Sequence, residues 1–275
     1  YTFAGWYTAA SGGTKVGTTY IVGKNNQEKN QSATLYAQWT ANKYTNTLNY
    51  DANGGSGAPA SQTASVTYPN TASKFTVSTT KPSRTGYTFT GWYTAASGGT
   101  KVETTYIVGS KDQAKNQSAT LYAQWTANKY TNTLYYDANG GSGAPASQTA
   151  SVTYPNTASK FTVSTTKPSR IGYTFIGWYT AASGGTKVET TYTVGSKDQA
   201  KNQSATLYAH WTANKYTNTL NYDANGGSGA PASQTVSVTY PNTASTFTIS
   251  STKPSRTGYT FAGWYTAASG GTKVG

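Results

Sequence analysis

The sequence predicts a mainly β, small α+β chain, built as an elongated tandem array of repeat domains of 86 residues. The evidence is a repeated phrase, short stretches in which apolar and polar residues alternate, and Gly-rich or Pro-containing breaks between them. The phrase YTFAGWYTAASGGTKVG opens the chain and also closes it. Its Gly-Trp pair recurs every 86 residues, at Trp6, Trp92, Trp178 and Trp264. We therefore expect the 275 residues to be a window on a longer array.

The composition favours small domains with aromatic cores. Charged residues make up 11% of the chain, whereas 24 Tyr and 7 Trp supply much of its apolar surface. Such side chains bury large areas with few rotatable bonds. Cys is absent, which excludes disulfides and thiol chemistry, and no apolar run is long enough to predict a membrane span.

The repeat that begins at Ala41 opens with a predicted hairpin. In residues 44–50, Leu48 and Tyr50 lie on one face of a strand and Thr dominates the other. The segment DANGGSGAPA then predicts a turn, because consecutive Gly and a Pro favour backbone angles that strands do not use. Alternation resumes over residues 61–68, which predicts the second strand. The predicted turn residues are Asp51, Asn53, Gly54 and Gly55.

The middle of the repeat contains its clearest strand. Residues 71–84 are ambiguous, since Phe75 and Val77 alternate as in a strand while residues 70–74 are compatible with one helical turn. GYTFTGWYT, residues 86–94, predicts a strand with Phe89 facing the core. Trp92 has the opposite parity unless Gly91 hosts a β-bulge, which a glycine in a strand permits.

The repeat is expected to end in a buried strand. Residues 95–102 form a loop, and a short strand then leads into a polar segment, 110–116, that is compatible with a helix. In residues 119–126 the apolar side chains share one face. Each repeat thus has four or five strands and at most one or two helical turns. The predicted core residues are Tyr50, Phe89, Leu121, Trp125, Phe175 and Trp211.

The repeat boundaries divide the chain into four parts. Residues 1–40 are the C-terminal half of a repeat, 41–126 and 127–212 are complete repeats, and 213–275 are the N-terminal part of another. Only four residues separate Trp125 from Tyr130, so we expect restricted rotation between neighbours. The complete repeats differ at five pairs of positions: Asn49/Tyr135, Thr85/Ile171, Thr90/Ile176, Ile107/Thr193 and Gln124/His210.

The blocks YDANGG, GYTFTGWYT and LYAQWT occur in this order in residues 41–126, and the next repeat keeps them with one substitution in each of the last two. In this respect the chain resembles the Listeria–Bacteroides repeat family, the B-repeat of the internalins. The resemblance implies a small β-grasp-like domain of secreted, surface-attached bacterial proteins, often present in long arrays. This repeat is longer than the usual family member, and the extra length lies in YPNTASKFTVSTT and GSKDQAKNQ.

The chain lacks the residue groups that catalysis or metal binding requires, so we expect a protein that is not an enzyme and needs no cofactor. The single histidine, His210, replaces Gln38 and Gln124 in the equivalent positions, and each repeat has three carboxylates that are not adjacent. The DANGG segment is a poor calcium loop, because Gln62 stands where a bidentate Glu is needed. A Gly-rich turn, in which Asp51 or Asn53 bonds its own backbone, is the better interpretation.

The net charge of +13 leaves a polyanion partner open, although the bases are dispersed and a solvated surface is favoured. Aromatic residues can also stack on sugar rings, although core packing is the alternative for Trp92. The candidate polyanion- or glycan-binding residues are Lys81, Arg84, Lys101, Lys111, Lys115, Trp92 and Tyr93.

The predicted function is that of a stalk, the structural repeat region of a secreted bacterial cell-surface adhesin that extends a terminal domain from the cell. The alternative is a glycan- or polyanion-binding array that acts by multivalency. Expected partners are neighbouring repeats, other copies of the chain through the incomplete terminal repeats, and acidic glycans or wall polymers. Nucleic acid and a membrane span are not expected.

Overall fold

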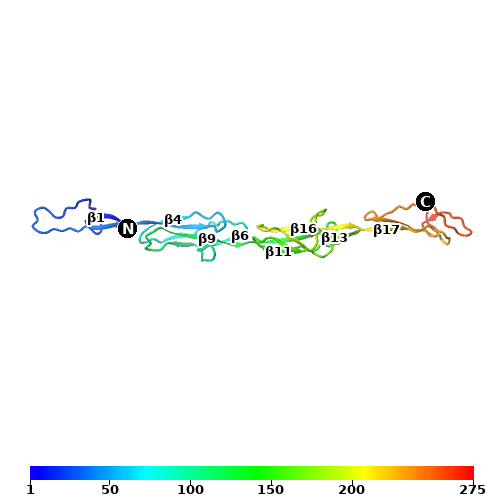
Figure 1. The fold of residues 1–275 in the computed structure, drawn as a ribbon, viewed down its shortest axis with the longest axis horizontal. Helices are drawn as coiled ribbons and strands as arrows, with labels where there is room; N and C mark the ends of the chain where they lie inside the picture. The colour runs from blue at the N-terminus through cyan, green and yellow to red at the C-terminus, as the bar shows by residue number, and fades with distance from the viewer. The chain divides into compact units, whose positions relative to one another are not determined.

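The computed structural model describes residues 1–275 and contains only strands, turns and loops (Figure 1). The mainly β prediction is confirmed. No helix is present, so none is long and apolar enough to cross a membrane. The chain divides into two compact units, at about residue 130, and each is described by itself.

The first unit contains the complete repeat 41–126. Its main sheet has the strand order β4-β3-β9-β6-β7, and a separate two-stranded sheet pairs β5 with β8. Strands β3 and β9 are parallel, whereas the other pairs are antiparallel. The strands are β3 (Lys43–Asp51), β4 (Gln62–Thr67), β5 (Ser73–Thr76), β6 (Tyr87–Tyr93), β7 (Lys101–Val102), β8 (Thr105–Val108) and β9 (Gln117–Ala127).

The second unit repeats this arrangement, with the main sheet in the order β11-β10-β16-β13-β14 and a small sheet of β12 and β15. Both sheets agree with the β-grasp-like domain that the resemblance implied. The strands are β10 (Lys129–Asp137), β11 (Gln148–Thr153), β12 (Ser159–Thr162), β13 (Tyr173–Tyr179), β14 (Lys187–Val188), β15 (Thr191–Val194) and β16 (Gln203–Ala213).

The incomplete repeats contain parts of this sheet. Residues 1–40 form β1 (Thr2–Tyr7) and β2 (Tyr36–Thr40), which pair with each other. Residues 213–275 form two hairpin pairs, and the equivalent of the last strand is not among them. The strands of this part are β17 (Lys215–Leu220), β18 (Gln234–Thr239), β19 (Trp264–Tyr265) and β20 (Lys273–Val274).

The helical turns considered for residues 70–74 and 110–116 are absent, and hydrogen bonding explains why. The fully buried Asn46 of β3 donates its amide hydrogens to Thr71 O (2.7 Å) and Ser73 Oγ (2.9 Å), which holds the first segment extended. In the second segment Asp112 has a left-handed backbone (φ 62°), which a helix does not accommodate. Its N–H donates to Pro69 O at 2.8 Å, so a turn replaces the helix.

A β-bulge in β6 decides where Trp92 lies. The register against β9 shifts between Phe89 and Gly91, and Gly91 has a φ of 147° that only glycine adopts easily. The extra residue places Phe89 and Trp92 on the same side, with ring centroids 5.4 Å apart. Trp92 is therefore a core residue and is 3% exposed.

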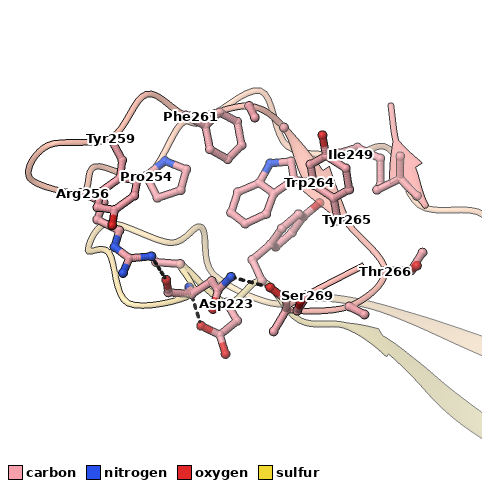
Figure 2. A pocket seen from close by; sticks show the side chains of 18 of the residues that line it. Asp223, Ile249, Pro254, Arg256, Tyr259, Phe261, Trp264, Tyr265, Thr266 and Ser269 are labelled. Atoms are coloured by element: carbon pink, nitrogen blue, oxygen red, sulfur yellow. Dashed lines mark hydrogen bonds between the residues drawn. The ribbon is translucent and has the colours of Figure 1, made fainter. Parts of the chain in front are cut away.

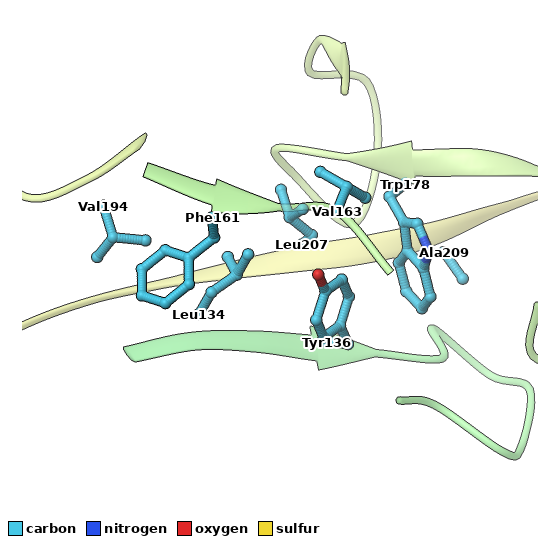
Figure 3. Close-up of a cluster of buried hydrophobic side chains, with 8 residues drawn as sticks. All are labelled: Leu134, Tyr136, Phe161, Val163, Trp178, Val194, Leu207 and Ala209. Atoms are coloured by element: carbon cyan, nitrogen blue, oxygen red, sulfur yellow. The ribbon is translucent and has the colours of Figure 1, made fainter. Parts of the chain in front are cut away.

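The core lies between the main sheet and the small sheet of each complete repeat. Leu121 is fully buried, and Tyr50, Phe89 and Trp125 pack around the same cluster. Phe175 and Trp211 occupy the equivalent places in the next repeat. Figure 3 shows that cluster: Leu134, Tyr136, Phe161, Val163, Trp178, Val194, Leu207 and Ala209.

Candidate functional site

The best-defined polar contact between repeats surrounds a single asparagine. In the second unit Asn214 is the one residue between β16 and β17. Its N–H donates to Gly172 O at 2.9 Å, and its side-chain Oδ1 accepts a 2.6 Å hydrogen bond from Thr174 Oγ1. Its carbonyl accepts a hydrogen bond from the N–H of Tyr240 at 3.0 Å. One linker residue therefore bonds to both the repeat that ends and the repeat that begins.

Aromatic packing completes this contact. The ring of Tyr240 meets the ring of Tyr173 edge to face, with centroids 5.3 Å apart. Gly172 lies directly under Tyr240, so that a β-carbon there would overlap the Tyr240 ring. The guanidinium of Arg170 covers the Tyr173 ring at 4.1 Å from its centroid. These groups border an open hollow of about 580 Å³.

The same contact occurs in the first unit, between residues 1–40 and the repeat that follows. Thr2 Oγ1 donates to Asn42 Oδ1 at 2.6 Å, and the N–H of Tyr68 donates to Asn42 O at 3.0 Å. Tyr1 and Tyr68 pack edge to face at 5.2 Å. A short, stiff junction could be predicted from the sequence, but the roles of this asparagine and tyrosine were missed. Their recurrence at fixed spacing was the available signal.

The DANGG segment, residues 51–55, forms a turn that is hydrogen-bonded to two other parts of the repeat, and we call this turn the clasp. Asp51 Oδ1 accepts a 2.7 Å hydrogen bond from the N–H of Asn53, as the Asx-turn interpretation predicts. Asn53 donates its side-chain amide to Ala96 O and Ala123 O, at 2.7 and 2.8 Å. Asn53 and Gly54 have positive φ angles, and a β-carbon on Gly55 would overlap the ring of Trp125. The predicted turn residues thus tie the hairpin to the last strand.

The predicted binding residues do not form one site. Trp92 is in the core, so its proposed role in stacking on a sugar is wrong for a folded repeat. Tyr93 follows it in β6 and therefore points to the outer face of the sheet. Arg84 stacks on Tyr87 at 4.2 Å and donates to Asn53 O at 3.3 Å, so its charge serves the clasp.

The lysines are separated from one another. Lys101 forms a 2.9 Å ion pair with Glu103, and this hydrogen bond raises the pKa of the Lys101 amine. Lys101 also lies at the opposite end of β6 from Arg84, since Tyr93 pairs with Lys101 whereas Arg84 precedes Tyr87. The remaining candidates are exposed in two different loops, Lys81 before β6 and Lys111 and Lys115 before β9.

In residues 213–275 an open groove of about 620 Å³ exposes apolar side chains (Figure 2). Its walls include Leu220, Ile249, Phe261 and Trp264. Their counterparts in the complete repeats pack against the last strand, through residues such as Leu207 and Ala209. The groove therefore lies where a complete repeat has its last strand.

A chain of small β domains with short, hydrogen-bonded junctions defines a tandem-repeat protein. This chain belongs to the Listeria-Bacteroides repeat domain family, whose profile matches residues 1–38, 47–124, 133–210 and 219–275.

Proteins of Listeria monocytogenes and Evansella cellulosilytica are similar to this chain. Internalin H of Listeria monocytogenes is 36% identical over 54% of this chain and 24% of its own length. A protein of Evansella cellulosilytica with the provisional name Gly-rich membrane protein is 29% identical over 96% of this chain and 27% of its own length. A second Evansella protein, provisionally named a membrane protein, is 32% identical over 66% and 24%. The chain spans about a quarter of the length of these relatives.

Proposed function

We propose that this chain is the stalk region of a bacterial cell-surface adhesin and that its work is mechanical rather than catalytic. Each repeat adds a fixed increment of reach, because it folds around its own core and bonds to its neighbour. Membership of the repeat family and the similarity to internalin H support an extracellular location at the cell surface.

One observation carries this proposal. At both junctions that lie within a unit, an asparagine bridges two repeats and two tyrosine rings pack beside it. A flexible linker would allow free rotation, whereas Asn214 has its N–H, side chain and carbonyl all engaged. Such a junction is suited to keeping neighbouring repeats of an array in a fixed relative orientation. A polyanion-binding array is less well supported, since the basic residues are dispersed and two of them have local partners.

The stiffness of a junction can be measured directly. The chain has no Cys, so the substitutions Ser183→Cys and Ser251→Cys place two spin labels on exposed sites in adjacent repeats of the second unit. We expect pulsed electron paramagnetic resonance to give a narrow distance distribution. Tyr240→Ala removes the ring that packs on Tyr173 and should broaden this distribution.

The matched control is Tyr265→Ala, which truncates an exposed tyrosine outside the junction and should leave the distribution narrow. A broad distribution in the unsubstituted chain would contradict the stalk proposal. A narrow distribution in the Tyr240→Ala chain would show instead that another feature holds the repeats together.

A further inference from the structure

The few differences between the complete repeats are concentrated on one surface. Of the five differing positions, three lie on the outer face of the main sheet, on its three central strands. In β10 the buried side chains of Leu134 and Tyr136 point inward, so that of Tyr135, which lies between them, points outward. Residues 41–126 have Asn49, Thr90 and Gln124 at these positions, and residues 127–212 have Tyr135, Ile176 and His210.

These replacements add two rings and one isoleucine to the outer face of the sheet, where Tyr135 pairs with Thr206, two residues before Tyr208. Tyr208 of β16 stands directly opposite Tyr179 of β13, and their neighbours Trp178 and Ala209 point into the core. The imidazole of His210 stacks on the Tyr179 ring, with centroids 3.9 Å apart and planes 9° apart. On the other side of β16, Tyr135 is exposed by 47%. We call Tyr135, Ile176, Tyr179, Tyr208 and His210 the aromatic face.

The exchange of Gln for His changes what this position does. Gln124 donates its amide to two carbonyls of the neighbouring loop, Ala95 O and Gly98 O. His210 retains a single contact of this kind, from Nε2 to Ala181 O at 2.8 Å. His210 therefore makes one hydrogen bond fewer to this loop than Gln124 does, but it places a stacked ring on the outer surface. Tyr135 likewise adds a ring in place of the equivalent Asn49, and Ile176 adds a larger apolar surface in place of Thr90.

We propose that the aromatic face is a binding site for a neutral glycan. Tyrosine and histidine rings offer flat apolar surfaces with polar edges, which match the alternation of C–H faces and hydroxyls in a sugar chain. Hydroxyl side chains surround the rings on the same strands and can bond to sugar hydroxyls. They include Thr131, Thr133 and Thr206.

The charges near the aromatic face favour a neutral ligand over an acidic one. Lys187 is paired with Glu189 at 3.0 Å, and Asp137 accepts a hydrogen bond from the N–H of Asn139. These groups carry one positive and two negative charges, although the chain as a whole carries +13. A polyanion would find no excess positive charge here.

The sister repeat supplies substitutions that are already compatible with this fold. Tyr135→Asn, Ile176→Thr and His210→Gln together convert the aromatic face into the surface that residues 41–126 have. We would titrate the 275-residue chain with chitohexaose, cellohexaose and polygalacturonate, following backbone amide shifts by NMR and stoichiometry by calorimetry. We expect a neutral hexasaccharide to shift the amides of β10, β13 and β16. The triple substitution should weaken that binding by about tenfold or more, since it removes two rings and the isoleucine from the face.

The reciprocal substitutions Asn49→Tyr, Thr90→Ile and Gln124→His should create a second site and raise the stoichiometry from one to two. The proposal is overturned if neither neutral sugar shifts these amides or if the triple substitution leaves the affinity unchanged. Preference for polygalacturonate, or self-association that the triple substitution abolishes, would also overturn it. The site does not depend on the stalk proposal, because spin-label distances and sugar binding are measured separately.

Discussion

The bulge at Gly91 lends itself to a quantitative test. An alanine there must adopt a φ of 147°, which costs on the order of 1–3 kcal/mol for a residue with a β-carbon. The alternative is to remove the bulge, which would turn Trp92 out of the core. Emptying a core of an aromatic side chain costs about 3–5 kcal/mol, so the strained bulge should persist. Gly91→Ala and Gly177→Ala, made together, should destabilise both complete repeats while both tryptophans stay buried.

Thermal denaturation followed by circular dichroism measures the loss of stability. Tryptophan emission shows whether the tryptophans stay buried. For a domain of this size each kcal/mol shifts the melting temperature by about 4–8 °C, so we expect a fall of roughly 5–20 °C. The control is Gly17→Ala, because Gly17 has ordinary backbone angles and nothing lies within 4 Å of an added β-carbon. An unchanged melting temperature would refute the strain argument. Red-shifted emission before the transition would show that the register slips instead.

Three further predictions concern the buried Asn46, the open groove of residues 213–275 and the ion pair of Lys101. Asn46→Ala leaves buried carbonyls without a donor and should cost about 1–3 kcal/mol, measured as a lower urea midpoint; an unchanged midpoint would contradict the role of this amide. A synthetic peptide with the sequence of β9 should enter the open groove of residues 213–275 and shift the Trp264 emission to the blue, whereas a scrambled peptide should not. Glu103→Gln should return the raised pKa of Lys101 towards its ordinary value in an alkaline NMR titration. Because that pKa is raised, any stability from the pair is present at neutral pH and lost as the pH rises through it.

Much of the repeat could be predicted from local patterns. Alternation identified the strands around Leu48, Phe89 and Leu121, since each has one face in the core. The glycine within the third predicted strand indicated the bulge, which then determined the position of Trp92. The Asx turn at Asp51 was also predictable, because an aspartate, an asparagine and two glycines favour that backbone.

Other features depend on contacts that local patterns do not contain. The segments considered as helical turns are extended or turned because the buried Asn46 and the distant Pro69 bind them. The scatter of the basic residues follows from long-range strand order, which places Lys101 and Arg84 at opposite ends of one strand. The aromatic face could not be predicted either, since Tyr135 and His210 are 75 residues apart and come to the same face of the sheet only through the register of β10, β16 and β13.

Near-identical repeats raise the question of how each strand finds its own partner. The parallel partner of β17 cannot be β16, although β16 has the required sequence, because Asn214 alone separates them and a parallel pair needs a crossover of a dozen residues or more. The same argument excludes β2 as the parallel partner of β3. Each first strand must therefore pair with a last strand other than the one directly before it, as β3 does with β9. The last strand of the next repeat is about twice as distant in sequence, and the longer loop costs only about 0.6 kcal/mol more in entropy. Loop entropy alone is thus a weak safeguard, and we infer that the bonds of Asn42 and Asn214 help to keep each repeat in register with its own strands.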